Sequence, residues 1–116
     1  MNYLSRQAII EADDLKTEDV AVPEWGGTVR VRTMTGEARD KLGAAMIGPN
    51  GRPDRGKFNL MLVAGSMVDE NGDPLFGFDE VAELGKKSAQ ALQRVADVAF
   101  RLNGLGEEQV KAAEGN

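Results

Sequence analysis

The chain has 116 residues, of which 41% are hydrophobic and 28% are charged. This length favours one domain with one hydrophobic core, and the apolar content excludes a fully disordered chain. Histidine and cysteine are both absent. Their absence removes disulfides, thiolate nucleophiles, cysteine-ligated zinc and every histidine-dependent catalytic triad. We therefore expect a protein that is not an enzyme, with no catalytic residues, no metal site and no cofactor.

Charge is divided unevenly along the chain. The 14 basic and 19 acidic side chains give a net charge of -5. By segment, residues 1–26 have two basic and six acidic residues (-4), residues 27–60 have seven and three (+4), and residues 61–116 have five and ten (-5). A net acidic chain is a poor candidate for binding nucleic acid, because phosphates attract Lys and Arg. The basic middle segment is where we expect an acidic partner to bind.

Apolar stretches are short. The longest runs from Leu60 to Val68 and is interrupted by Gly65 and Ser66, whereas a membrane span needs roughly 20 apolar residues. The first ten residues lack the cationic start and long apolar region of a signal peptide. The sequence therefore predicts a soluble, intracellular protein that does not associate with membranes.

Capping residues and apolar periodicity predict three elements in the N-terminal half. They are a helix after Ser5 that ends at Asp13 and Asp14, a β-hairpin over residues 18–34, and a helix over about residues 36–47 that follows Thr35. In the second strand of the hairpin, Val29 and Val31 point to one face and Arg30 and Arg32 to the other. One face of the hairpin is therefore apolar and the other basic.

The C-terminal half is predicted to be mainly helical. Its elements are a mobile loop over residues 48–56, a helix with an apolar stripe from Phe58 to Val68, a polar turn over residues 69–74, a short helix capped by Asp79 that ends at Gly85, a helix over about residues 89–103 capped by Ser88, and a last short helix from Glu107 that frays over about residues 111–116. The stripe of Leu92, Val95, Ala99 and Leu102 is expected to face the core. Its heptad-like spacing leaves self-association open.

Together these elements give the fold class. We expect an α+β fold that is mainly α-helical, with four to five helices and one N-terminal antiparallel β-hairpin, in a single domain over residues 1–116.

The polar turn has part of the pattern of a calcium-binding loop. Asp69, Asn71 and Asp73 occupy alternate positions, and Glu80 falls at the twelfth position, where a bidentate carboxylate sits in such loops. However, Pro74 occupies the sixth position, which needs glycine for its sharp turn. We therefore predict a solvated turn and no metal ion.

Three residues are candidates for binding a partner: Trp25, Arg30 and Arg32. Trp25 lies at the tip of the predicted hairpin, where it either anchors an interface or folds back over Val29 and the core. Arg30 and Arg32 either pair with acidic groups of a partner or with nucleic acid, or protect a strand edge against aggregation. Residue chemistry alone thus indicates an acidic α+β domain whose role is to bind another macromolecule.

Four segments of the sequence carry a family resemblance. They read ADDLKTEDV (residues 12–20), VPEWGGTVRVR (22–32), VDENGDPLF (68–76) and LGKKSAQALQRVADVAFRLNGL (84–105). The hairpin with Val-Pro-Glu-Trp-Gly-Gly and the helix start with Gly-Lys-Lys-Ser are the most specific. Over about residues 3–110 the chain resembles the tail assembly chaperones of long-tailed bacteriophages and prophages.

The resemblance implies a role rather than a reaction. Such chaperones bind the long, helical, aggregation-prone tape measure protein in the host bacterial cytoplasm before the tail tube assembles, and they are not kept in the finished virion. In many such phages a programmed ribosomal frameshift makes an extended form whose extra domain contacts the major tail protein. The resemblance therefore implies three partners: the tape measure protein, the major tail protein through such an extended form, and further copies of the chain.

Two other functions are compatible with the sequence. A structural virion protein, such as a head–tail connector or tail completion subunit, would suit a small α+β domain. A nucleic-acid-binding regulator would use the basic middle segment, but the net charge and the lack of aromatic residues between the basic ones argue against it.

Overall fold

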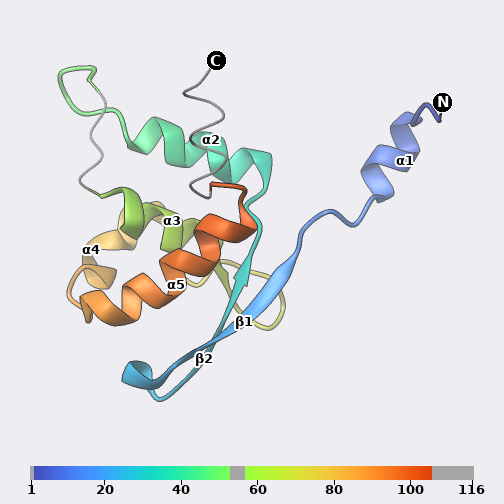
Figure 1. The fold of residues 1–116 in the computed structure, drawn as a ribbon. Helices are drawn as coiled ribbons and strands as arrows, with labels where there is room; N and C mark the ends of the chain where they lie inside the picture. The colour runs from blue at the N-terminus through green and yellow to red at the C-terminus, as the bar shows by residue number, and fades with distance from the viewer. Residues whose placement is uncertain (1, 53–56, 106–116) are drawn as a thin grey trace.

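Five α-helices and a three-stranded antiparallel sheet form the part of the chain that the computed structural model describes, residues 2–52 and 57–105 (Figure 1). In chain order the elements are α1 (Arg6–Glu11), β1 (Thr17–Val22), the 3-10 turn η1 (Pro23–Trp25), β2 (Gly27–Arg32), α2 (Gly36–Ala45), α3 (Phe58–Ser66), β3 (Met67–Val68), the 3-10 turn η2 (Phe78–Glu80), α4 (Val81–Leu84) and α5 (Ala89–Leu102). The predicted α+β class and the N-terminal hairpin are confirmed. No helix within these residues has the length and apolar character that crossing a membrane requires.

The hairpin has one apolar and one polar face, as predicted. β1 and β2 pair along their whole length, with Val20 opposite Val29. Because side chains alternate along a strand, Val22 and Val31 share that face, and both are fully buried. Arg30 lies on the opposite face, which is polar.

The third strand was not expected. α3 ends at Ser66, and Met67 and Val68 pair with Val31 and Arg30 of β2. The predicted helical stripe through Val68 is therefore wrong in its last two residues. The backbone of β2 offers these residues ladder hydrogen bonds, and both side chains are almost fully buried, so the sheet replaces the last helical turn.

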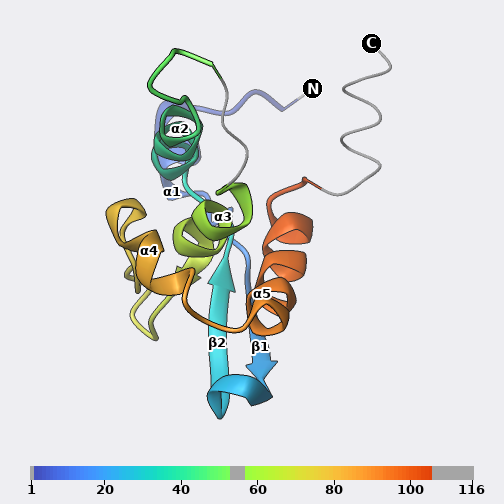
Figure 2. The same cartoon turned by 90° about the vertical axis from the view of Figure 1, so that its left-hand side faces the viewer.

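Helix α5 covers the apolar face of the sheet and also packs against α3 (Figure 2). Val95, Ala96 and Ala99 are completely buried at this contact, and the small alanine side chains let the helix approach its neighbours closely. Leu92 and Leu102, at the two ends of the stripe, are half-buried and pack on the same core. The prediction that the stripe faces the core is confirmed.

A glycine in α3 allows two large side chains to pack against the helix. A Cβ atom at Gly65 would stand 2.8 Å from the sulfur of Met34 and 3.1 Å from Cζ of Phe78. Both distances are shorter than ordinary van der Waals contact, so a larger residue at this position would displace its neighbours.

One buried amide connects the ends of three elements. Asn103, which follows α5, is 8% exposed. Its Oδ1 accepts a hydrogen bond from the backbone N–H of Met34 (2.8 Å), and its Nδ2 donates to Oγ of Ser66 (3.2 Å) and to the carbonyl of Ala99 (2.8 Å). The side chain thus ties the end of α5 to the end of α3 and to the segment after β2.

Three of the four predicted helix caps are confirmed. The hydroxyls of Ser5, Thr35 and Ser88 accept hydrogen bonds from the backbone N–H three residues later, at 3.1, 3.1 and 3.2 Å. The prediction that Asp79 caps a helix is wrong. The chain turns two residues earlier than expected, so Gly77 takes the extended N-cap position and Asp79 lies inside η2.

Several predictions fall partly or wholly outside the described residues. They are the helix from Glu107, the frayed end over residues 111–116 and the second half of the loop over residues 48–56. In the first half of that loop, the N–H of Gly48 donates to the carbonyl of Arg52 (2.7 Å), and Gly51 has a φ of +77°. Residues 48–52 therefore form a hydrogen-bonded turn, while the mobility of the loop and a single domain over residues 1–116 stay predictions.

Candidate functional site

Two apolar grooves flank the segment that links β3 to η2. One groove, of about 510 Å³, lies between α2, α3 and η2 and includes Ala38, Ala64 and Phe78. The other, of about 480 Å³, opens beside the hairpin turn. We call the second one the hairpin groove; its lining residues are Glu24, Trp25, Val29, Met67, Leu75, Phe76, Leu84 and Lys87. Apolar walls with a few charged residues at the rim are typical of binding surfaces.

Trp25 combines the two roles that the sequence left open. It lies at the hairpin turn, is half-buried, and packs against the core cluster, while part of it lines the hairpin groove. The turn is held in place by Arg94 of α5, whose Nε donates to both carboxylate oxygens of Glu24 at 3.0 Å. A hydrogen bond from its own backbone N–H and this contact with Arg94 lower the pKa of Glu24.

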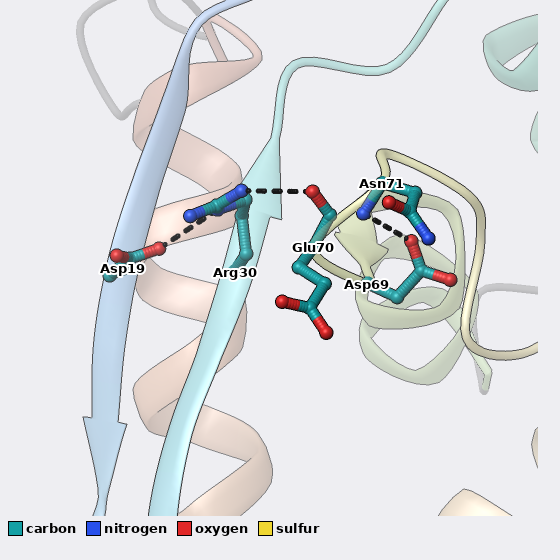
Figure 3. Close-up of polar contacts among 5 residues, drawn as sticks. All are labelled: Asp19, Arg30, Asp69, Glu70 and Asn71. Carbon is teal, nitrogen blue, oxygen red and sulfur yellow. Dashed lines mark hydrogen bonds and ion pairs between the residues drawn. The ribbon is translucent and has the colours of Figure 1, made fainter.

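Arg30 and Arg32 lie on the polar face of the sheet, away from α5. Figure 3 shows Arg30 between Asp19 of β1, which its Nε contacts at 3.1 Å, and the carbonyl of Glu70, at 3.5 Å from Nη1. The guanidinium of Arg32 lies beside Gly72, since a Cβ there would stand 3.1 Å from Nη1. β3 pairs with β2 at Arg30 and Val31, so Arg30 lies between two strands and the edge-protection hypothesis does not apply to it.

Other basic residues of the middle segment also contact groups of the chain itself. Nη1 of Arg39 donates to the backbone carbonyl of Asn103 (3.2 Å), and Lys41 forms an ion pair with Glu37 at 3.3 Å. The +4 charge of residues 27–60 is therefore partly committed to intramolecular contacts.

A bidentate ion pair fixes α5 to the start of the hairpin. Nη1 and Nη2 of Arg101 donate to the two carboxylate oxygens of Glu18 at 2.9 and 2.8 Å. These hydrogen bonds lower the pKa of Glu18 and raise that of Arg101. Both groups face solvent, so the contact orients the helix and does not create a reactive group.

The polar turn over residues 69–74 is held together by Asp69, as Figure 3 shows in part. Its Oδ1 accepts hydrogen bonds from the backbone N–H of Asn71 (2.8 Å) and Asp73 (3.0 Å). Gly72 has a φ of +86°, which the turn requires. The Asp69 carboxylate therefore serves the turn itself, and the prediction of a polar turn is confirmed.

The described residues hold few buried polar groups. Within residues 2–52 and 57–105 no three metal-ligating side chains gather at one point. The buried polar residues in this part of the chain are Ser66 and Asn103, which bond to each other. Every titratable group described here is at least partly exposed.

A further apolar surface was missed by the sequence analysis. Among the residues that the structure describes, the large apolar side chains that remain exposed are those of Tyr3, Leu4, Ile9, Ile10, Ile47 and Leu75. The first four belong to residues 3–14, which include α1 and which we call the N-terminal arm. α1 has no buried residue and projects away from the other helices in Figure 1. The sequence signal for this surface was the pair of adjacent isoleucines, Ile9 and Ile10, in a short helix.

Comparison with known proteins finds a likeness in fold. No protein-family model matches the sequence, and no curated protein matches it. The structure is similar to that of the bacteriophage HK97 tail assembly chaperone, with a TM-score of 0.58 and 20% sequence identity over 83% of this chain and 90% of that chain. The chain therefore shares the fold of the bacteriophage HK97 tail assembly chaperone, in agreement with the family that its sequence resembles.

Proposed function

We propose that this chain is a tail assembly chaperone of a long-tailed bacteriophage or prophage. In this role it binds the tape measure protein in the host cytoplasm, keeps it soluble until the tail assembles, and catalyses no reaction. The observation that carries the proposal is the fold shared with the HK97 protein over 83% of the chain. The hairpin and helix-start motifs of the sequence support it independently.

The surface of the molecule is compatible with a long helical client. Two apolar grooves and the exposed arm give several separate apolar contacts, which suit a client with repeated, imperfect sites. Trp25, Arg30 and Arg32 stay our candidates for contacting the client directly.

Two further parts of the proposal concern assembly. A frameshift-extended form would carry an extra domain that contacts the major tail protein. The chaperone itself would leave before the virion is complete.

Co-expression with a tape measure protein from the same genome tests the proposal. We expect the fraction of soluble tape measure protein to rise when the chain is present. Leu75→Ser in the hairpin groove should reduce the effect. Ile47→Ser, which changes a similarly exposed residue outside both grooves, is the matched control. A client that is equally insoluble with and without the chain refutes the proposal.

Mass spectrometry of purified virions separates a chaperone from a structural subunit. A chaperone is absent from virions, whereas a head–tail connector or tail completion subunit is present in fixed copy number. Detection of the chain in stoichiometric amounts would replace our proposal with the structural role.

A further inference from the structure

The hairpin groove lies where the hairpin extends past the rest of the sheet. β3 pairs with two residues of β2, so Val29 and the turn at Trp25 stand beyond the third strand (Figure 1). Met67 and Leu84 in the groove are 1% and 2% exposed, whereas Leu75 is 45% exposed. The groove is therefore an apolar hollow with a buried floor and a wall that is open to solvent.

The hairpin turn at the groove is held in position by an ion pair. Nε of Arg94 in α5 contacts both carboxylate oxygens of Glu24 at 3.0 Å, and Trp25 packs on the core cluster. A groove that already has its binding shape loses less entropy when a partner binds. Its volume of about 480 Å³ is within the usual range for ligand pockets.

The edge of the groove is basic. Glu24 is paired with Arg94, and Lys86 is paired with Glu83 at 3.6 Å. Lys87, which lines the groove, is exposed and forms no ion pair in the part of the chain that the structure describes. Helix α5 begins two residues later and has no acidic residue in its first turn, so the positive end of its dipole adds to the same charge.

The groove between α2, α3 and η2, which we call the α2 groove, has the opposite charge at its edge. Lys41 there is paired with Glu37 at 3.3 Å, whereas Asp79 has no ion pair among the described residues. The uncompensated charge is therefore negative and repels acidic groups of a partner. Since both grooves are apolar and of similar volume, about 510 and 480 Å³, the charge at the edge is what distinguishes their partners.

The described residues leave the hairpin groove open. The N-terminal arm is apolar, but it is joined to the other end of β1, and α1 and α4 lie on opposite sides of the molecule in Figure 1. α1 has no buried residue, so it is not docked on another part of the chain. We therefore look for the occupant of the groove in another molecule.

A helix with acidic residues beside its apolar face has the matching chemistry. An amphipathic helix binds a groove by inserting apolar side chains that are three and four positions apart. An acidic side chain next to this apolar stripe meets the uncompensated lysine at the edge of the groove. A long helical client offers many such segments.

We infer that the hairpin groove binds amphipathic helical segments of the client in which acidic residues flank the apolar side chains. The apolar side chains contact Trp25 and Leu75, and an acidic side chain pairs with Lys87. The identity of the client rests on the proposed function, whereas the chemistry of the bound segment follows from the groove. The α2 groove does not bind these acidic segments.

Trp25 is the only tryptophan of the chain, so its fluorescence reports on this groove. The probes are two synthetic helical peptides without tryptophan, which share one face of leucines and carry either glutamates or lysines beside it. We expect the glutamate peptide to shift the emission of Trp25 to shorter wavelengths. It should bind the wild-type chain roughly tenfold more tightly than the lysine peptide, because repulsion by Lys87 replaces attraction. This preference should weaken as the ionic strength rises from about 0.01 M to about 0.15 M.

Charge reversal at the edge of the groove is the decisive variant. Lys87→Glu should invert the preference, so that the lysine peptide binds more tightly than the glutamate peptide, a result that loss of folding does not produce. Leu75→Ser should weaken the binding of both peptides and keep their order. Lys41→Glu, the same reversal at the edge of the α2 groove, is the matched control and should leave both affinities at the hairpin groove unchanged.

Three outcomes overturn the inference. The first is that the two peptides bind the wild-type chain equally or not at all. The second is that Lys87→Glu keeps the wild-type preference. The third is that the emission of Trp25 shifts as the concentration of the chain rises without any peptide, which would assign the groove to a second copy.

Failure of this inference is distinct from failure of the proposed function. If the tape measure protein is kept soluble but the glutamate peptide does not bind, the chaperone role stands and the client binds elsewhere. If the peptides behave as expected but the tape measure protein stays insoluble, the chemistry of the groove stands and the proposed function fails.

Discussion

Replacing Asn103 by alanine should destabilise the protein more than any other single loss of a polar side chain that we describe. The substitution leaves the buried N–H of Met34 without an acceptor, because this backbone group cannot rotate towards another one. Ser66 loses one hydrogen bond, but its hydroxyl can reorient. Ala99 keeps a partner, since its carbonyl also accepts from the backbone N–H of residue 103 at 3.0 Å.

The size of the effect follows from these three groups. An orphaned buried donor costs about 1–3 kcal/mol, and the lost neutral hydrogen bond of Ser66 about 1 kcal/mol. We expect Asn103→Ala to lower the free energy of unfolding by about 2–4 kcal/mol. At roughly 4 °C per kcal/mol for a chain of this length, the melting temperature falls by roughly 8–16 °C.

Urea unfolding followed by circular dichroism measures this loss. Asn71→Ala is the matched control, because Asn71 is exposed and should change stability by less than about 0.5 kcal/mol. Ser66→Ala and the double variant complete a cycle, in which we expect a coupling of about 0.5–1.5 kcal/mol. If Asn103→Ala stays within about 0.5 kcal/mol of the wild type, the amide does not join the three elements as we describe.

Three further experiments test the packing at Gly65, the ion pair of Glu18 and the helix caps. Gly65→Ala forces a methyl group into occupied space and should lower the free energy of unfolding by about 1–3 kcal/mol. Gly43→Ala is the control, because Gly43 lies in the last turn of α2 and a Cβ there meets no other atom; this change should raise the free energy of unfolding by about 0.5–1 kcal/mol. Equal effects of the two changes in urea unfolding would contradict this packing. Glu18→Gln removes a carboxyl whose pKa is lowered from 4.5 by its arginine partner. Such a group stabilises the fold above pH 4.5, and this contribution is lost as the pH falls through the pKa of the folded state. The difference in melting temperature between Glu18→Gln and the wild type should therefore shrink below about pH 4.5. Ser88→Ala should lower the free energy of global unfolding by about 1 kcal/mol. Ser5→Ala should leave this free energy unchanged, because α1 is not packed on the core. An equal loss for both variants would show that α1 docks on the core.

The elements that the sequence predicts correctly have signals a few residues apart. Ser88 lies directly before an apolar helical stripe, and Val29 and Val31 alternate with charged residues. Asn71-Gly72 provides its own turn chemistry. In each case the backbone conformation follows from neighbours in the chain, so no knowledge of the remaining fold is needed.

The features that the sequence misses depend on distant partners. β3 exists because β2 offers backbone groups to Met67 and Val68, more than 30 residues away in the chain. Asn103 is separated from Met34 by 69 residues, and alone it predicts no more than the end of a helix. The hairpin groove likewise combines Trp25 with Leu75, a residue in a connecting segment that follows no periodic pattern.

The distribution of charge also differs between the sequence and the folded structure, and this changes where an acidic partner should bind. The basic middle segment suggested the surface of β2, but there Arg30 is paired with Asp19, and Lys41 is paired with Glu37 on α2. Lys87 belongs to a segment with a net charge of -5, yet it lies at an apolar groove without an ion pair among the described residues. A partner gains most binding energy from a charge that is not already compensated and that lies beside an apolar surface. Binding of an acidic partner should therefore be lost with Lys87→Ser and kept with Arg30→Ser. The reverse result would place the binding site on the polar face of the hairpin.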